Sequence, residues 1–174
     1  MKTRRRWFRG VFVVCLPVVL AGCAGYTLGP SNGERAGMRS VSVDPAVNTT
    51  LEPRFGTAVG NALRQRLQQD GTYRLETATR GDIVVHVEVI EYRRQSIAFK
   101  PTDTLTAQEY GLTMTARVIA TESATGKRLL DQELHGRTSI VLASDQTSAE
   151  RQALPLIADD LARNITARLV DGAW

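Results

Sequence analysis

Residues that usually carry catalysis or hold metals are scarce in this chain. Its 174 residues include two cysteines, Cys15 and Cys23, and two histidines, His86 and His135. A disulfide framework needs several cysteine pairs, and a structural zinc site needs four ligands. No Gly-rich phosphate loop, paired-carboxylate motif or Ser-centred elbow stands out. The sequence therefore predicts a protein that is not an enzyme, with no catalytic residues, no metal and no cofactor.

The two histidines nevertheless form the best candidate metal-binding site that the sequence offers. Both fall in predicted strands, His86 beside Glu88 and His135 beside Glu133. If the two strands were neighbours in the same register, these side chains would share one face of the sheet. The alternative is two solvated strand residues, and we favour it because the spacing is not that of metal ligands.

A hydrophobic run long enough to span a membrane is also missing at the N-terminus. The apolar stretch, even counted from Val11 to Gly22, has 12 residues, whereas a transmembrane helix takes about 20. Preceded by cations and followed by Leu20-Ala21-Gly22-Cys23, it has the order of a secretory signal and resembles the bacterial lipobox. We expect residues 1–22 to be cleaved and Cys23 to carry a covalent lipid such as palmitate.

Removing that signal changes the charge balance. The whole chain has 22 Lys and Arg against 18 Asp and Glu, and five of these cations lie within the first nine residues. The remainder has 17 basic against 18 acidic side chains, so the charge gives no support for nucleic-acid binding. Cys15 would leave with the signal, and no free thiol would remain.

The mature chain is expected to form one domain on a short tether. Residues 23–38 are rich in Gly, Pro, Ser and Asn and show no apolar period, which is typical of a flexible segment. Its root-mean-square reach is on the order of 20 Å, so the domain should lie close to the leaflet that anchors it. Residues 39–174 suffice for a single periplasmic domain with a real core.

Hydrophobic periodicity predicts a β-α-β-β-β-α order. Apolar residues recur every four positions from Phe55 to Leu67 and again from Leu154 to Leu169, and they alternate in the strands between. Thr49 and Glu52 have the spacing of a capping box, and Pro155 is expected to kink the last helix or delay its start. The expected elements are a strand at 40–43, a helix at 52–70, a possible edge strand at 72–76, long strands at 83–90, 109–118 and 127–141, and a helix at 148–171.

These patterns together define a fold class. Each helix has one apolar stripe, and each long strand has one apolar face, so both helices can cover the same side of the sheet. We therefore predict an α+β two-layer sandwich, in which two helices pack on one face of a four- to five-stranded mixed sheet. The other face would be open and polar.

Basic residues gather in two predicted connections and on the last long strand. Guanidinium and ammonium groups pair well with phosphate, which makes these side chains candidates for contact with an anionic lipid. The alternative is ordinary solvated surface charge. The candidates are Arg93, Arg94 and Lys100 after the first long strand, Lys127 and Arg128 at the hairpin, and Arg137 further along.

With the elements laid out, the chain resembles the LPS-assembly lipoprotein family LptE over its whole mature length. The resemblance depends more on the order and spacing of segments than on any one sharp motif. The residues that carry it are Cys23-Ala24-Gly25-Tyr26-Thr27-Leu28, Asn48-Thr49-Thr50-Leu51-Glu52-Pro53, Asn61-Ala62-Leu63-Arg64, Gly81-Asp82-Ile83-Val84, Gln108-Glu109-Tyr110 and the final helix with Trp174.

The resemblance implies a location, a partner and a ligand. Ala24 after the lipidated cysteine implies sorting to the periplasmic side of the outer membrane. The implied partner is a large outer-membrane β-barrel, the LPS-assembly protein LptD, which the domain would help to assemble and would plug. The implied ligand is lipopolysaccharide, with Lys100 at a position where the family can carry a lipid-contacting basic residue.

Two other functions fit parts of the pattern. A lipoprotein cofactor that activates a periplasmic cell-wall synthase would use a similar strand-helix domain, but the short tether disfavours it because crossing the periplasm takes a longer linker. The second is a lipid-anchored hydrolase, but the sequence shows no set of residues that would form a catalytic nucleophile and its base.

Overall fold

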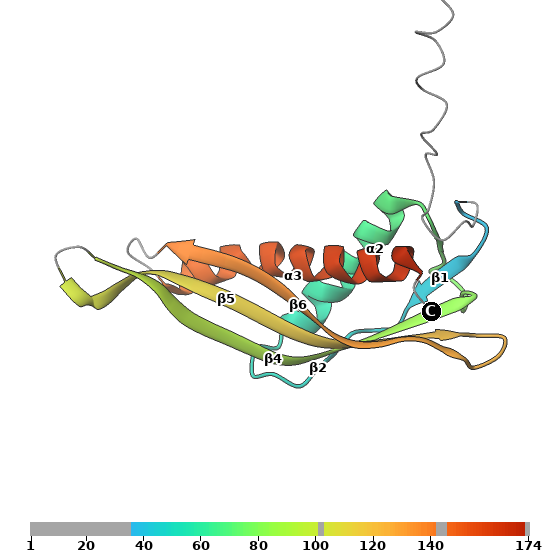
Figure 1. The fold of residues 1–174 in the computed structure, drawn as a ribbon, viewed down its shortest axis with the longest axis horizontal. Helices are drawn as coiled ribbons and strands as arrows, with labels where there is room; N and C mark the ends of the chain where they lie inside the picture. Colours follow the sequence, from blue (N-terminus) through green and yellow to red (C-terminus); the bar gives the residue numbers. More distant parts are fainter. Residues whose placement is uncertain (1–35, 101–102, 142–145, 173–174) are drawn as a thin grey trace, which may run out of the picture.

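In the computed structural model, residues 36–100, 103–141 and 146–172 are described, and within them six strands form one mixed sheet with two helices on one face (Figure 1). The predicted α+β sandwich is therefore confirmed. The elements in chain order are β1 (Ser40–Val43), β2 (Val47–Asn48), α2 (Phe55–Asp70), β3 (Arg74–Leu75), β4 (Ile83–Lys100), β5 (Asp103–Glu122), β6 (Arg128–Val141) and α3 (Gln146–Asp171).

The strand order is β3-β1-β4-β5-β6, and β2 pairs with β4 beside β1. Strand β1 runs parallel to both β3 and β4, whereas β4, β5 and β6 form an antiparallel meander. The sheet is thus mixed, as predicted. The short strands β2 and β3, of two residues each, bring the described strands to six.

The core lies between the sheet and the two helices, which both lie above the sheet in the view of Figure 1. The predicted helix stripes and strand faces point into it, because alternate strand residues share one face. The largest fully buried side chains are Leu63, Leu67, Ile83, Leu112, Met114, Ile157, Leu161, Ile165, Leu169, Val41, Val59 and Val85.

Helix α3 approaches β6 most closely at Gly136. A Cβ atom added at Gly136 would lie 2.4 Å from the Ile157 carbonyl oxygen and 2.7 Å from the Leu161 Cβ. Only a residue without a side chain fits there, so Gly136 determines how closely the helix packs on the strand.

The Gly81-Asp82 segment directly precedes β4 and is hydrogen-bonded to β1. The Asp82 carboxylate accepts hydrogen bonds from the Ser40 backbone N–H at 2.8 Å and from the Ser40 hydroxyl at 2.7 Å. The Ser40 hydroxyl oxygen in turn accepts from the Asp82 N–H at 2.9 Å. These bonds fix the parallel pairing of β1 with β4.

The start of α2 differs from the prediction. The capping box was wrong: the Thr49 hydroxyl donates to the Val89 carbonyl at 3.0 Å, and the Glu52 carboxylate accepts from Arg54. Helix α2 begins at Phe55 without a side-chain cap. Asn48 orders the preceding turn instead, since its Nδ2 donates to the Glu52 carbonyl at 2.7 Å.

Other boundaries also differ, and β5 extends beyond the predicted 109–118 at both ends. Helix α3 begins at Gln146 and continues through Pro155, so the proline does not delay its start. Strand β4 continues to Lys100, which places Arg93 and Arg94 within a strand rather than in a connection. Neither helix in the described ranges combines the length and the apolar character needed to cross a membrane.

Candidate functional site

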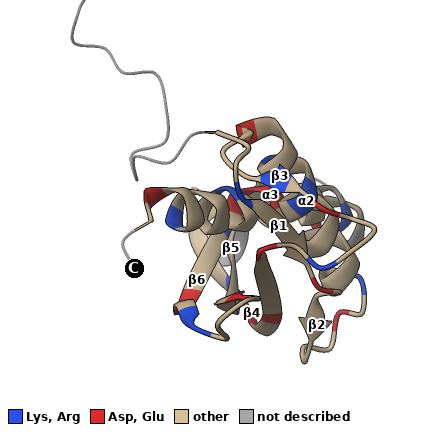
Figure 2. Cartoon of the chain, turned by 90° about the vertical axis from the view of Figure 1, so that its right-hand side faces the viewer, with Lys and Arg blue, Asp and Glu red and all other residues tan. Residues whose placement is uncertain are grey.

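The face of β4, β5 and β6 that points away from the helices is polar, as predicted. Basic and acidic positions are interspersed over both layers of the molecule (Figure 2). Near the β5–β6 turn the charges neutralise one another: Arg117 Nε donates to Asp131 Oδ1 at 3.1 Å and Arg128 Nη1 donates to Asp131 Oδ2 at 2.6 Å. The hydrogen bond from Arg117 is the main cause that lowers the pKa of Asp131.

Further from that turn, the strand register brings two candidate arginines together. Arg93 on β4 and Arg137 on β6 both lie opposite Thr113 on β5, so the three residues form one cross-strand row. Two strand spacings separate the arginines, roughly 10 Å between backbones. We call Arg93, Thr113 and Arg137 the arginine row.

The two arginines differ in their surroundings. Arg93 Nε donates to Glu91 Oε1 at 2.7 Å, and the Arg93 side chain is 74% exposed. Arg137 is exposed, and no acidic side chain among the described residues forms an ion pair with its guanidinium. The row therefore offers guanidinium donors to an anion on the open face.

The other two lipid-contact candidates lie elsewhere. Arg94 points to the helix-covered side, where it forms an ion pair with Glu150 of α3 and lies 5.3 Å from the centre of the Tyr110 ring. Lys100 is the last residue of β4, and its side chain lies outside the described part of the chain. The structure thus brings Arg93 and Arg137 together and separates Arg94 from them.

Exposed apolar side chains lie four to six residues further along the strands from the arginine row, toward the end of the sheet. Ile97 is 54% exposed, Phe99 50% and Val141 61%. Ile97 Cγ2 lies 3.2 Å from where a Gly111 Cβ would stand, so this side chain covers Gly111 on the sheet. The sequence analysis did not select Ile97 or Val141. Simple alternation from Ile83 would have placed Ile97 on the helix-covered face, because it misses the register shift between Val89 and Glu91. Val141 is the last residue of the strand predicted at 127–141.

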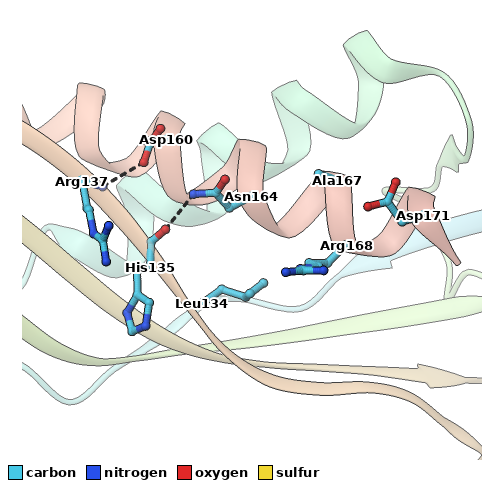
Figure 3. A pocket seen from close by; sticks show the side chains of 8 residues that line it. All are labelled: Leu134, His135, Arg137, Asp160, Asn164, Ala167, Arg168 and Asp171. Carbon is cyan, nitrogen blue, oxygen red and sulfur yellow. Dashed lines mark hydrogen bonds between the residues drawn. The ribbon is translucent and has the colours of Figure 1, made fainter. Parts of the chain in front are cut away.

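A groove of about 570 Å³ runs between the outer edge of β6 and α3 (Figure 3). Asp160 Oδ2 accepts from the Arg137 backbone N–H at 2.9 Å, and Asn164 Nδ2 donates to the His135 carbonyl at 2.8 Å. In Figure 3 the side chains of His135 and Arg137 point away from α3. The lining residues are Leu134, His135, Arg137, Asp160, Asn164, Ala167, Arg168 and Asp171.

The structure separates the two histidines. Their strands β4 and β6 are not neighbours, because β5 lies between them. His86 shares a row with Ile119 and Asp131, whereas His135 shares one with Thr115 and Glu91. Within the described residues no group of three or more Cys, His, Asp and Glu side chains is placed to hold a metal. The condition for a site shared by His86 and His135, that their strands be neighbours in register, is therefore not met.

Solved structures with the same fold come from several bacteria. A hypothetical protein from Chlamydia trachomatis is similar with a TM-score of 0.55 and 15% identity over 76% of this chain and 96% of its own. A protein from Xanthomonas campestris is similar with a TM-score of 0.55 and 10% identity over 82% and 93%. A putative lipoprotein from Caulobacter crescentus has a TM-score of 0.52 and 15% identity over 74% and 87%. At these identities the likeness shows the fold alone.

A family match identifies the chain more closely. Among curated protein sequences, none matches it. The model of the family described as LptE, lipopolysaccharide-assembly, matches residues 38–169. That range covers all described strands and nearly all of α3. The chain therefore belongs to the LptE lipopolysaccharide-assembly family.

Proposed function

We propose that this protein is the lipid-anchored subunit of a lipopolysaccharide translocon, held by Cys23 at the periplasmic side of the outer membrane. The family match over residues 38–169 carries this proposal. The signal pattern that ends at Cys23 supplies the anchor. The protein acts by binding and assembling with its partner, and it catalyses no reaction.

The partner is a large outer-membrane β-barrel of the LptD type, which the domain plugs and helps to assemble. The polar open face of the sheet supports this role, because the interior walls of such barrels are polar. An apolar face would be poorly matched to that wall.

Lipopolysaccharide contacts the arginine row and the apolar side chains beside it. Arg93 and Arg137 suit the phosphates of this lipid, and Ile97, Phe99 and Val141 suit its acyl chains. Lys100 joins them by the family resemblance. Arg94 has a different role, since its guanidinium already pairs with Glu150.

The partner is tested by affinity purification of the tagged full-length protein from detergent-solubilised outer membranes, with mass spectrometry of the retained proteins. We expect a large β-barrel in a stoichiometric amount. Recovery of a cell-wall synthase in its place would favour the alternative of a synthase-activating cofactor. Recovery of neither would overturn the translocon proposal.

Lipid contact is tested with the double variant R93A/R137A in a lipopolysaccharide-binding assay. Each lost charged hydrogen bond costs about 1.5 kcal/mol or more when water is excluded, so we expect binding weaker by roughly tenfold or more. The matched control is R128A, an exposed arginine on the same sheet that pairs with Asp131. Equal losses in both variants would point to general charge attraction.

A further inference from the structure

Helix α3 is anchored unevenly along its length. Its later part is deeply packed, with Ile157, Leu161, Ile165 and Leu169 at most 1% exposed. Polar contacts strengthen that part: Arg66 Nε donates to Asp159 Oδ1 at 2.7 Å. The buried Tyr73 hydroxyl donates to the Leu169 carbonyl at 2.9 Å.

The earlier part, residues 148–154, covers the helix side of the sheet. It lies close to the position of the arginine row, which is on the other face of the same strands. Ala153 is buried there, whereas Ala149 and Leu154 are half-buried. Glu150 pairs with Arg94, but the two side chains are 31% and 41% exposed. An ion pair that is this accessible to water holds two elements together only weakly.

Pro155 separates the two parts. It has no backbone N–H, so the Arg151 carbonyl loses its helical partner, and the proline ring crowds the preceding turn. Pro155 is exposed, and Leu156 beside it is 60% exposed. Breaks in helices occur at such positions.

We propose that residues 148–154 form a strap that opens about Pro155 while the rest of α3 stays docked, and that the Arg94–Glu150 pair adds a weak contact that favours the closed position. Opening uncovers Tyr92 and Tyr110, which pack against the core near this pair. The strap follows from the packing of α3 and does not depend on the lipopolysaccharide proposal.

Hydrogen exchange with mass spectrometry on the full chain tests the strap. We expect the amides of residues 151–154 to exchange at least tenfold faster than those of residues 157–169. R94A should accelerate exchange of 151–154 by about two- to fivefold, which corresponds to the loss of an exposed ion pair, and leave 157–169 unchanged. P155A should slow exchange of 151–154, since it restores the missing hydrogen bond.

The control is R117A, which removes an ion pair of similar exposure on the open face and should leave α3 unchanged. Uniform acceleration of all α3 amides in R94A, or no acceleration, would overturn the proposal.

Discussion

At the scale of single residues, the packing of the two layers depends on positions that carry no charge and little bulk. Gly136 is one such residue. Its missing side chain lets the backbone of α3 at Ile157 come within contact of β6. Protein interiors are close-packed, so even one added carbon is felt at such a contact.

Substitution G136A should therefore destabilise the fold. The added methyl must displace α3 from β6, and overpacking of this kind costs about 1–3 kcal/mol. Thermal or urea unfolding measures the loss. S139A, an exposed change on the same strand, should remain within about 0.5 kcal/mol of the wild type. Equal stability of G136A and S139A would show that the helix shifts freely.

Asp82 makes stability depend on pH. Hydrogen bonds from the Ser40 backbone and then the Ser40 hydroxyl lower the pKa of Asp82 below its ordinary value. Because the folded pKa is the lower one, its contribution is present above the unfolded pKa of about 4 and is lost as the pH falls through the folded pKa.

The measurement is the Tm of D82N and wild type between pH 7 and pH 2. D82N should melt earlier at pH 7, and the difference should shrink as the pH falls below about 4. The matched control is E133Q, which removes an exposed carboxylate from β6. A Tm difference that is constant with pH would contradict the role of the Asp82 charge.

At the scale of elements, α3 does more than cover the core, since it also protects the edge of the sheet. Strand β6 is an edge strand in the described sheet, and unpaired edges promote association between chains. The side chains of Asp160 and Asn164 hydrogen-bond the Arg137 N–H and the His135 carbonyl on the edge of β6. These two backbone groups are therefore not available to a strand of another molecule.

The double variant D160A/N164A should be less stable by about 1–2 kcal/mol, since a typical hydrogen bond contributes about 1 kcal/mol. It should also self-associate at concentrations at which the wild type does not. Unfolding experiments and light scattering measure the two effects. R163A removes the exposed ion pairs of Arg163 with Asp159 and Asp160 but leaves the side chains of Asp160 and Asn164 on the β6 edge, and it should not associate. A monomeric double variant would show that the edge needs no protection.

The elements themselves were largely predictable, but the length of β4 was not. The alternation from Ile83 to Ile90 is clear in the sequence, and the structure confirms it. A bulge between Val89 and Glu91 then shifts the register, so the residues facing the helices change from odd to even positions. Because of this shift, the apolar alternation in the sequence stops at Ile90 although the strand continues. Arg93 and Arg94 were predicted to lie in a connection for that reason.

At the scale of the whole molecule, the first described residues and the arginine row lie apart along the sheet. The described chain begins beside Thr72, whose carbonyl accepts from the Gly37 N–H. Arg93 lies ten residues along β4 from Ile83, roughly 33 Å at the rise of a strand. The arginine row is thus held at a distance from the first described residues of the domain.

The substitution C23S should separate anchoring from folding. Without the cysteine no lipid can be attached, so the protein should move from the membrane fraction to the soluble periplasmic fraction. The domain at 39–174 should keep its Tm, since the anchor lies outside it. Immunoblots of cell fractions measure the first effect. A C23S variant that remains in the outer membrane would contradict the anchoring role of Cys23.

The sequence by itself determined the order of helices and strands and their two-layer arrangement, because periodicity within one segment shows which face is apolar. It also indicated the LptE family. Tertiary structure decided which distant residues meet: Arg93 with Arg137, Arg94 with Glu150, and His86 apart from His135. These contacts depend on strand order, on register and on one bulge, which arise from pairing between segments and are not encoded in any segment alone.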